Sequence, residues 1–275
     1  MKKPLFNQIA IVGLGLIGGT LALATKKMGL ARQVIGVSRS ERTLLEALRR
    51  KAVDVATTDL KKGVSGADLV VLCAPVSVIE SQLKVIQKYL KKNALVTDVG
   101  SSKIEIERAA RTHLKKNTFV GAHPLAGSEK TGIFSADADL FKRSVCFITK
   151  RNTRVEGFWK ALGSRPVILN AVAHDDLVAK TSHTPHALAF SLFQTKKDFP
   201  RNTPPNPSIR ELARLAKSDA DLWADVFMSN REALLESIVE TERKGIHLLK
   251  EMLRLGDRAG IVRFIKQANK NSFNS

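Results

Sequence analysis

The chain has 275 residues, of which 44% are hydrophobic, so it is long enough for two domains with sizeable cores. Its apolar runs are short, and none approaches the ~20 residues of a membrane-spanning helix. The chain opens directly onto a predicted strand, so we expect no signal peptide. The two cysteines, Cys73 and Cys146, fall in predicted strands and form no disulfide or metal-binding pattern. We therefore expect a cytoplasmic protein without a bound metal or a membrane partner.

The formal net charge is +19, from 45 basic and 26 acidic residues. Such a charge is typical of nucleic-acid-binding proteins. However, the basic residues are spread along the chain, and aromatic residues make up only 5% of it, without the aromatic–basic interleaving that stacks bases. We favour a solvated basic surface that attracts anionic ligands, and we expect no nucleic-acid partner.

A strand pattern, a glycine turn and an apolar helix pattern follow one another between residues 9 and 28. The glycines have G-x-G-x-x-G spacing, which in this context is typical of dinucleotide binding. The first allows the tight turn, the second lets the backbone approach a pyrophosphate, and the third lets the helix pack on the strand. The phosphates would lie at the helix N-terminus. The alternative is a glycine turn without a ligand. The residues predicted to bind the cofactor here are Gly13, Gly15, Leu16, Ile17 and Gly18.

Strands and helices alternate through residues 1–170. Further strands are predicted at 33–37, 69–73, 94–97, 118–121, 144–149 and 166–169, and helices at 41–51, 78–90, 104–114 and 155–162. This alternation predicts an α/β fold with a doubly wound parallel sheet of the Rossmann type. Ligands bind such sheets outside the carboxyl ends of the strands. Several segments follow strands and should share that edge: Gly13, Ser38–Arg39, Ala74–Pro75, Asp98–Ser102 and His123. We expect Ala74 and Pro75 to contact the cofactor.

Residues 171–275 show helical periodicity and no strand pattern. One helix is predicted from Ala171 to Lys196, with Pro185 inside it. A second begins at a Ser218–Asp219 cap and continues to Leu255, interrupted at Gly245. Some 35 residues at 1.5 Å each give about 50 Å, about twice the diameter of a domain of ~100 residues. Its apolar faces need more cover than this half provides, so we expect the half to form a homodimer.

The end of the second predicted strand indicates which nicotinamide cofactor is used. An NAD-binding fold usually carries Asp or Glu there, to bond the ribose hydroxyls. This chain has Ser38, Arg39 and Ser40 instead. Arg39 would pair with a 2′-phosphate, and the serines could donate hydrogen bonds to it. We favour NADP, with NAD possible; the alternative is that Arg39 is simply a surface arginine.

His123 follows a strand at the predicted cofactor edge, and Pro124 restricts its backbone to extended geometry. A fixed imidazole there suits a general base, because its pKa is near neutral. The alternative is a histidine that only ends the strand. His183 and His186 are three residues apart and share a helix face. No carboxylate completes a metal site on that face, so we favour substrate binding over metal binding, with interior packing as an alternative for either one.

The segment 98–103 ends a strand and opens a helix. Either Ser101 or Ser102 is expected to cap that helix, and the other could reach a substrate hydroxyl.

Taken together, these motifs resemble the prephenate/arogenate dehydrogenase family over nearly the whole chain. The glycine motif is shared by many dehydrogenases, whereas the histidine and arginine motifs, in this order and spacing, are specific to the family. The segments that carry the resemblance are Gly13–Gly19, Asp98–Lys103, His123–Gly132, Ser182–His186, Ala213–Ala216, Leu222–Trp223 and Ser229–Leu235.

The resemblance implies an oxidative decarboxylation of prephenate or arogenate, in which a base takes the proton of the ring hydroxyl and hydride leaves the same carbon. His123 matches the family's catalytic histidine, and Ser101 matches the serine that orients the hydroxyl and the nicotinamide. Arg214 matches the arginine that clamps a substrate carboxylate, which suits a guanidinium. Four more positions match residues that line the substrate pocket: Ser128, Glu129, His186 and Trp223.

The chain departs from the family pattern at two places. Ala213 stands where the family often has a threonine before the arginine, which removes one hydroxyl but leaves the arginine. Ser38–Arg39 replaces an acidic residue of many relatives, which supports NADP. We expect neither a C-terminal regulatory domain nor a chorismate mutase domain, so any inhibition by tyrosine would act at the active site.

No residue decides between the two substrates, and we lean to arogenate because NADP use and arogenate use often occur together in the family. Two rival functions remain. One is a β-hydroxyacid or imine-reducing dehydrogenase, against which the His123 motif argues. The other is a Rossmann protein without enzymatic activity that binds nucleic acid.

Overall fold

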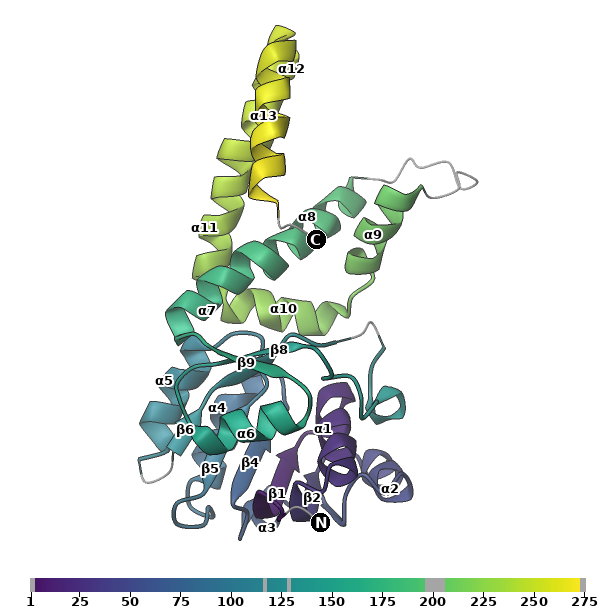
Figure 1. The fold of residues 1–275 in the computed structure, drawn as a ribbon, viewed down its shortest axis with the longest axis vertical. Helices are drawn as coiled ribbons and strands as arrows, with labels where there is room; N and C mark the ends of the chain where they lie inside the picture. Colours follow the sequence, from purple (N-terminus) through teal and green to yellow (C-terminus); the bar gives the residue numbers. More distant parts are fainter. Residues whose placement is uncertain (1–2, 116–117, 128–129, 196–205, 273–275) are drawn as a thin grey trace.

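The computed structural model describes residues 3–115, 118–127, 130–195 and 206–272. Its N-terminal half is built on a parallel six-stranded sheet with the strand order β3-β2-β1-β4-β5-β6 (Figure 1). This is the order of the Rossmann fold, which reverses direction between β1 and β4 and leaves a ligand crevice there. The strands are β1 (Phe6–Val12), β2 (Ala31–Val37), β3 (Val55–Thr57), β4 (Leu69–Leu72), β5 (Leu95–Asp98) and β6 (Thr118–Val120).

The sheet is covered by helices on both faces, as the alternating pattern predicted. All four residues of β4 and all four of β5 are buried, because helices lie over both sides of these strands. Side-chain caps begin two of the helices, from Ser40 at α2 and Asp59 at α3. The helices are α1 (Leu16–Lys27), α2 (Glu41–Arg49), α3 (Leu60–Val64), α4 (Val76–Ile86) and α5 (Ile104–His113).

A second, three-stranded sheet was not expected from the sequence. Strand β7 (Ala122–Pro124) pairs antiparallel with β8 (Val145–Ile148), which pairs parallel with β9 (Arg165–Ile168). The prediction that these segments continue the large parallel sheet is therefore wrong: after β6 the chain passes directly into β7 and leaves that sheet. The short helix η1 (Ile133–Ser135) and α6 (Thr153–Ala161) belong to this part of the chain.

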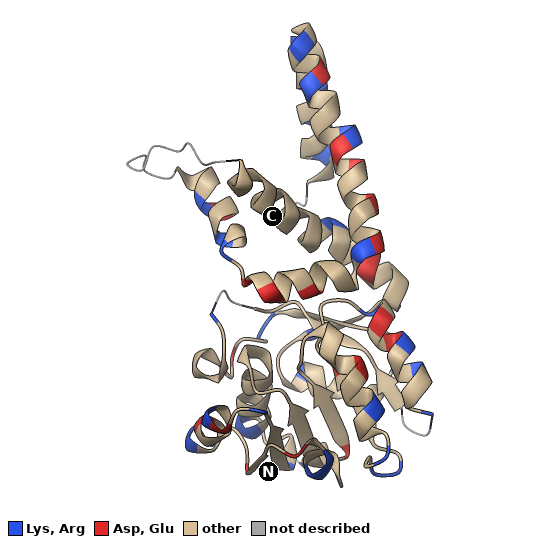
Figure 2. Ribbon diagram, turned by 180° about the vertical axis from the view of Figure 1, so that it is seen from behind, with Lys and Arg blue, Asp and Glu red and all other residues tan. Residues whose placement is uncertain are grey.

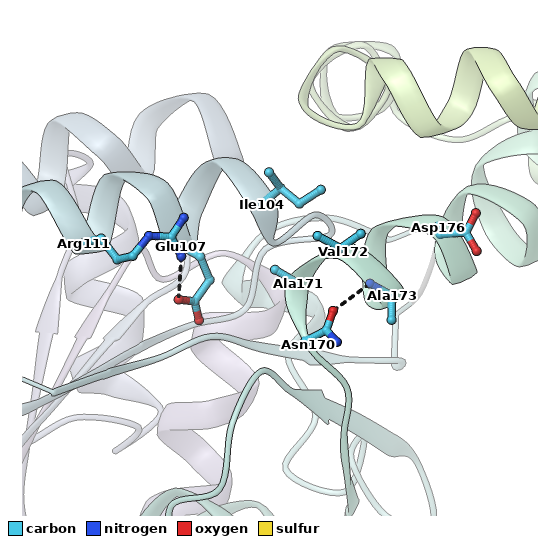
Figure 3. A pocket seen from close by; sticks show the side chains of 8 residues that line it. All are labelled: Ile104, Glu107, Arg111, Asn170, Ala171, Val172, Ala173 and Asp176. Atoms are coloured by element: carbon cyan, nitrogen blue, oxygen red, sulfur yellow. Dashed lines mark hydrogen bonds and ion pairs between the residues drawn. The ribbon is translucent and has the colours of Figure 1, made fainter.

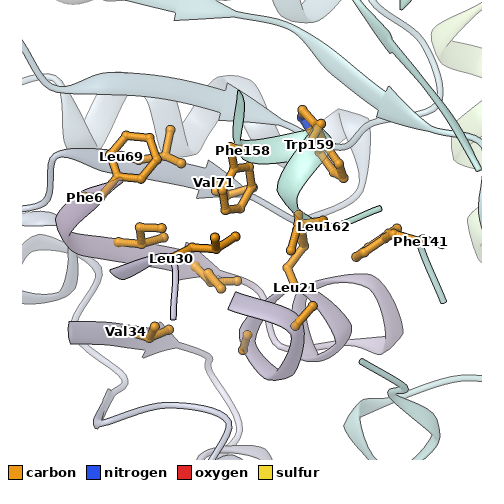
Figure 4. Close-up of a cluster of buried hydrophobic side chains, with 14 of the residues drawn as sticks. Phe6, Leu21, Leu30, Val34, Leu69, Val71, Phe141, Phe158, Trp159 and Leu162 are labelled. Carbon is orange, nitrogen blue, oxygen red and sulfur yellow. The ribbon is translucent and has the colours of Figure 1, made fainter. Parts of the chain in front are cut away.

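The main hydrophobic core lies between the large sheet, α1 and α6 (Figure 4). Phe158 and Trp159 of α6 are fully buried and make edge-to-face contacts with aromatic rings from elsewhere in the chain. The partners are Phe6 on β1 and Phe141, at ring-centroid distances of 6.2 Å and 5.5 Å. Such geometry is favourable for aromatic pairs, so α6 ties the segment after β7 to the first strand.

The C-terminal half is entirely helical in its described residues and rises from the sheets as Figure 1 shows. The predicted helix from Ala171 is present, with a π-helical segment just before Pro185; Lys196 lies outside the described residues. The elements are α7 (Ala171–Val178), π-helical η2 (Ala179–His183), α8 (Thr184–Gln194), α9 (Pro207–Ala216), α10 (Ala220–Ser229), α11 (Arg231–Thr241), π-helical η3 (Glu242–His247), α12 (Leu248–Leu255) and α13 (Arg258–Asn271).

The single helix predicted from Ser218 to Leu255 is wrong. Asp219 caps α10 as expected, but Asn230 adopts φ −124° and ψ 33°, and the chain turns there into α11. The remaining run from Arg231 to Leu255 is about 37 Å long at 1.5 Å per residue. Gly245 lies within η3, where the helix widens without ending. Gly256, in the left-handed conformation, ends α12, and α13 folds back along it (Figure 1).

Charged residues are spread over both halves, and Lys and Arg alternate with Asp and Glu along the helices that project from the molecule (Figure 2). Among the described residues, no helix combines the length and the apolar character needed to cross a membrane.

Candidate active site

The glycine turn after β1 has the geometry of a dinucleotide-binding loop. Gly13 has φ +96°, a conformation that side chains other than glycine rarely adopt, and a Cβ on it would lie 2.6 Å from the carbonyl oxygen of Cys73. A Cβ on Gly18 would lie 1.8 Å from the carbonyl oxygen of Gly13, so only glycine lets α1 approach the strand. A Cβ on Gly15 would meet nothing within 4 Å, which leaves this position open to a ligand.

The N-terminus of α1 suits an anion. Gly15 is its N-cap and supplies no side-chain hydrogen bond, and the first turn, which contains Leu16 and Ile17, has no acidic residue. Its free N–H groups and the helix dipole favour phosphate. Ala74 and Pro75 follow β4, and the Ala74 nitrogen would lie 3.4 Å from a Gly13 Cβ. The residues present therefore fit a dinucleotide.

The end of β2 presents an arginine next to this crevice. Arg39 is exposed, and the described part of the chain offers it no ion-pair partner. The Ser38 hydroxyl oxygen accepts a hydrogen bond from the Ser40 backbone, and the Ser40 hydroxyl oxygen caps α2 by accepting from the Thr43 backbone. Both hydroxyl protons remain available to an incoming acceptor.

A buried ion pair joins the end of β5 to the strand that carries His123. Lys103 donates to the Asp98 carboxylate and, at 2.9 Å, to the carbonyl of Ala122. The Asp98 carboxylate also accepts from the Ala122 backbone at 3.1 Å and from Gly100 at 2.8 Å. These bonds hold β7 against β5, so they place His123 at the carboxyl edge of the large sheet, as predicted.

His123 contacts a second imidazole that the sequence analysis did not single out. Its Nδ1 lies 2.9 Å from Nε2 of His174, and Nδ1 of His174 lies 2.7 Å from the Asp175 carboxylate. His174 and Asp175 are buried, whereas His123 is partly exposed. The described part of the chain contains no hydrogen-bond partner for Nε2 of His123. A nitrogen of this kind can accept a substrate proton.

Neither Ser101 nor Ser102 caps helix α5, so that expectation is wrong. The cap comes from the helical half: the Asp175 carboxylate accepts from the backbone N–H groups of Lys103 and Ile104 at 2.7 Å and 2.9 Å. The Ser102 hydroxyl is buried and donates to Ser229 of α10 at 2.9 Å. Ser101 is partly exposed on the loop between β5 and α5, which keeps it as the serine of the two that can reach a ligand.

A cluster of aromatic rings lies in the helical half, around Trp223. His186 stacks on Trp223, with ring centroids 3.5 Å apart and planes inclined by 22°, and His183 contacts the same indole edge-on at 6.0 Å. Nδ1 of His186 donates to the carbonyl of Ser182 at 2.8 Å, close to the break that Pro185 makes in the helix. The shared face predicted for the two histidines is therefore formed around Trp223.

Arg214 lies on α9 with 61% of its side chain exposed, 3.5 Å from the carboxylate of Glu211. Its positive charge contributes to a lowered pKa of His186, although burial contributes most to that shift. The arginine is thus electrostatically connected to the ring stack of His186 and Trp223. A surface ion pair of this kind contributes little stability, so a ligand carboxylate can replace Glu211.

The imidazoles of His123 and His183 are neutral at pH 7. Burial lowers the pKa of His123 well below 6.5, and the nearby His174, Lys103 and His183 lower it further. Burial also lowers the pKa of His183 to about 4.

We expect kcat/KM to stay constant as the pH falls through about 6.5, the usual value for histidine, because His123 keeps its lone pair there. The rate should fall only at lower pH, which a profile of kcat/KM against pH checks. An acid limb centred at or above that value would contradict the prediction that His123 is the general base.

Two surface hollows lie at the junction of the two halves. One of about 720 Å³ lies between α5 and the start of α7 and contains none of the predicted site residues (Figure 3). The other, of about 550 Å³, is lined by Pro75 and by Asp225, whose carboxylate accepts from the backbone N–H groups of Val76 and Ser77.

In the part of the chain that the structure describes, no group of three His, Cys, Asp or Glu side chains is arranged for a metal ion. Ser128 and Glu129 lie outside the described residues.

Matches to family models and to known relatives identify the protein family of this chain. The prephenate dehydrogenase nucleotide-binding domain matches residues 21–163, and the prephenate dehydrogenase dimerization domain matches residues 170–267. Prephenate dehydrogenase of Lactococcus lactis is 34% identical over 96% of this chain and 76% of its own. Cyclohexadienyl dehydrogenase of Zymomonas mobilis is 32% identical over 84% of this chain and 83% of its own.

Solved structures agree. Prephenate dehydrogenase of Aquifex aeolicus, in complex with hydroxyphenyl propionate and NAD+, is similar with a TM-score of 0.87 and 26% identity, covering 98% of each chain. Synechocystis arogenate dehydrogenase has a TM-score of 0.81 and 27% identity, covering 96% of this chain and 98% of its own. A 3-hydroxyisobutyrate dehydrogenase of Mycobacterium tuberculosis, at 13% identity and a TM-score of 0.58, shares the fold alone. Two family models match, and a relative is 34% identical over 96% of this chain, so we conclude that this chain belongs to the prephenate dehydrogenase family.

Proposed function

We propose that this protein catalyses the NADP-dependent oxidative decarboxylation of arogenate to tyrosine, with prephenate, which would give 4-hydroxyphenylpyruvate, as the alternative substrate. The observation that carries the proposal is the position of His123, which lies at the carboxyl edge of the nucleotide-binding sheet and contacts the helical half through His174. The reaction would take place in the cytoplasm, whose reducing conditions suit the free thiols of Cys73 and Cys146.

The chain supplies a base and a carboxylate-binding group for this reaction. His123 accepts the proton of the ring hydroxyl through the nitrogen that His174 does not contact. Ser101 orients the hydroxyl, and Arg214 pairs with a substrate carboxylate. Trp223 and His186 form an aromatic wall against which the ring can lie, with Ser128 and Glu129 as further pocket residues. When bound, the nicotinamide accepts the hydride that leaves the carbon bearing the hydroxyl.

The test is direct. Purified protein is mixed with NADP or NAD and with arogenate or prephenate, and the absorbance of the reduced cofactor is followed together with the release of carbon dioxide. We expect the highest kcat/KM with NADP and arogenate. If no cofactor is reduced with either substrate, the proposal is wrong and a different dehydrogenase or a non-enzymatic role is favoured.

The preference for NADP is proposed from Arg39, supported by Ser38 and Ser40. Replacing Arg39 with Asp removes a charge-assisted hydrogen bond to the 2′-phosphate and adds repulsion, so we expect the NADP-to-NAD ratio of kcat/KM to fall about 10- to 30-fold. Steady-state kinetics with both cofactors measures this ratio. The matched control is Arg32→Asp, at the opposite end of β2, which should leave the ratio unchanged. An unaltered ratio in Arg39→Asp would remove Arg39 from cofactor recognition.

We further propose that the protein is a homodimer formed through its helical half. The match to a dimerization domain supports this. So do large apolar side chains that are more than half exposed along the projecting helices, namely Leu235, Val239, Ile246, Leu253 and Leu255. Light scattering coupled to size-exclusion chromatography should give twice the mass of the chain, whereas Leu253→Glu combined with Leu255→Glu should shift it toward the monomer.

A further inference from the structure

The hydrogen bonds around His174 have a direction that the chemistry of their partners determines. A carboxylate only accepts hydrogen bonds. The two oxygens of Asp175 accept from the backbone N–H groups of Lys103 and Ile104, at 2.7 Å and 2.9 Å. The same carboxylate lies 2.7 Å from Nδ1 of His174. Nδ1 of His174 must therefore carry a proton and donate it.

The direction of the next hydrogen bond follows. When His174 is neutral, its single N–H group is on Nδ1, and Nε2 carries a lone pair. This nitrogen lies 2.9 Å from Nδ1 of His123, which must then be the donor. The proton of a neutral His123 is thereby placed on Nδ1, and its lone pair is on Nε2.

We propose that Asp175, acting through His174, holds His123 in the tautomer with the proton on Nδ1, so that Nε2 is the atom that accepts the substrate proton. His174 and Asp175 are positioning residues, because they contact the base and not the substrate. Once Nε2 takes the proton from the ring hydroxyl, His123 is an imidazolium, and the Asp175 carboxylate stabilises its charge through His174. The role of Nε2 rests on the proposed function, whereas the tautomer does not.

The surroundings hold these groups in one arrangement. His174 and Asp175 are at most 1% exposed. The ring of Phe147 on β8 packs edge-on against His174, with centroids 5.5 Å apart and planes at 81°. Because Asp175 lies on α7 and its backbone donors lie at the start of α5, the carboxylate also joins the two halves of the chain. The tautomer of His123 therefore depends on the contact between the halves.

His183 is held in the opposite tautomer and supplies an internal reference. The side-chain amide of Asn230 lies 2.8 Å from the backbone carbonyl of Asp175, which only accepts, so its NH2 group faces that oxygen. The same NH2 group lies 3.2 Å from Nδ1 of His183, which must accept. Neutral His183 therefore carries its proton on Nε2.

Nitrogen NMR distinguishes these histidine tautomers in the protein without substrate or cofactor. The full chain is labelled with 15N-histidine, and long-range proton–nitrogen correlations are recorded above pH 7, with His123→Asn and His174→Leu used to assign signals. We expect His123 to show the Nδ1–H pattern and His183 the Nε2–H pattern. In His174→Leu, the His123 signals should shift toward a mixture of the two tautomers while His183 is unchanged. A wild-type His123 with its proton on Nε2 would overturn the proposal, even if the enzyme proved inactive with both substrates.

Kinetics of matched variants provide the second readout. His174→Leu removes the acceptor at similar volume, so kcat should fall about tenfold, as for the loss of one hydrogen bond, with KM nearly unchanged. His174→Gln places an amide oxygen near the position of Nε2 and should recover most of kcat and of the Nδ1–H signal. The control His113→Leu, in the last turn of α5 and outside this network, should retain both. Equal kcat in the wild type and His174→Leu would contradict the positioning role, and a Gln variant as slow as the Leu variant would point to packing instead.

Discussion

Replacing His123 with Asn should lower kcat by about 10²- to 10⁴-fold, the usual contribution of a general base. The amide of Asn has a similar shape and polarity but cannot accept a proton near neutral pH. KM should change little, because the proposed substrate contacts to Arg214 and Trp223 remain. The measurement is steady-state kinetics of cofactor reduction with the better of the two substrates, together with a binding titration of that substrate.

The control for this variant is His113→Asn, which changes an imidazole on α5 whose neighbour is Glu80 at 3.9 Å. Its kcat should match that of the wild type. Thermal unfolding of both variants separates a loss of fold from a loss of chemistry. If His123→Asn retains the wild-type rate, the base is another group and the proposed mechanism is wrong.

The nucleotide-binding half was predictable because its signals are local. An apolar run that is buried on both faces, such as Leu69–Leu72, identifies a central parallel strand without knowledge of its neighbours. Gly18 was readable for the same reason, since its closest contact is Gly13 in the same turn. Gly13 was readable from the glycine spacing, although its closest contact is Cys73, after β4.

The small sheet was not predictable because its pairing is not local. The segments of β8 and β9 were predicted as strands, but no pattern in them states that β8 pairs with His123 rather than with the large sheet. The break at Asn230 was missed for a related reason. Asn is only a weak helix breaker, and this one ends α10 because its buried side chain bonds to Asp175 and His183, which lie far away in the sequence.

The same distinction separates the candidate site residues that the sequence indicated from those that only the structure indicates. His123 was found through its strand and through Pro124, which are its sequence neighbours. His174 was given no role, since its partner His123 is 51 positions away. One local signal was available: His174 and the acidic Asp175 are adjacent in the first helical turns after β9, where both prove buried. A buried histidine next to a buried carboxylate at a domain boundary is a reason to look for function.

The carboxylates of the helical half join it to the nucleotide-binding half. Asp175 accepts from the first N–H groups of α5, and Asp225 accepts from those of α4. Both helices follow strands that end at the cofactor edge, so each carboxylate completes a helix N-terminus that would otherwise bind water. Of the groups proposed to act on the substrate, His123 lies in one of the halves that these carboxylates join and Arg214 lies in the other. The contribution of Arg214 can be measured separately.

Replacing Arg214 with Gln should raise KM for the substrate by about 100-fold, because a bidentate pair with a carboxylate comprises two charge-assisted hydrogen bonds. The clamp is made equally well before and during the reaction, so kcat should fall much less than KM rises. The proposed partner is the substrate carboxylate, since the present partner, Glu211, lies at 3.5 Å in an exposed pair that water can replace.

Two further variants make the result specific. Arg214→Lys keeps the charge but loses the two-pronged geometry, so its KM should lie between those of the wild type and of Arg214→Gln. Lys217→Gln removes a positive charge from the C-cap of the same helix, and it should leave KM unchanged if the site responds to one guanidinium and not to the general basic surface.

Product inhibition measures the same contact independently, because tyrosine keeps the side-chain carboxylate and loses the ring carboxylate. If Arg214 binds the side-chain carboxylate, inhibition by tyrosine weakens in Arg214→Gln as KM rises; if it binds the ring carboxylate, tyrosine inhibits both proteins equally. A wild-type KM in Arg214→Gln would remove this arginine from the site.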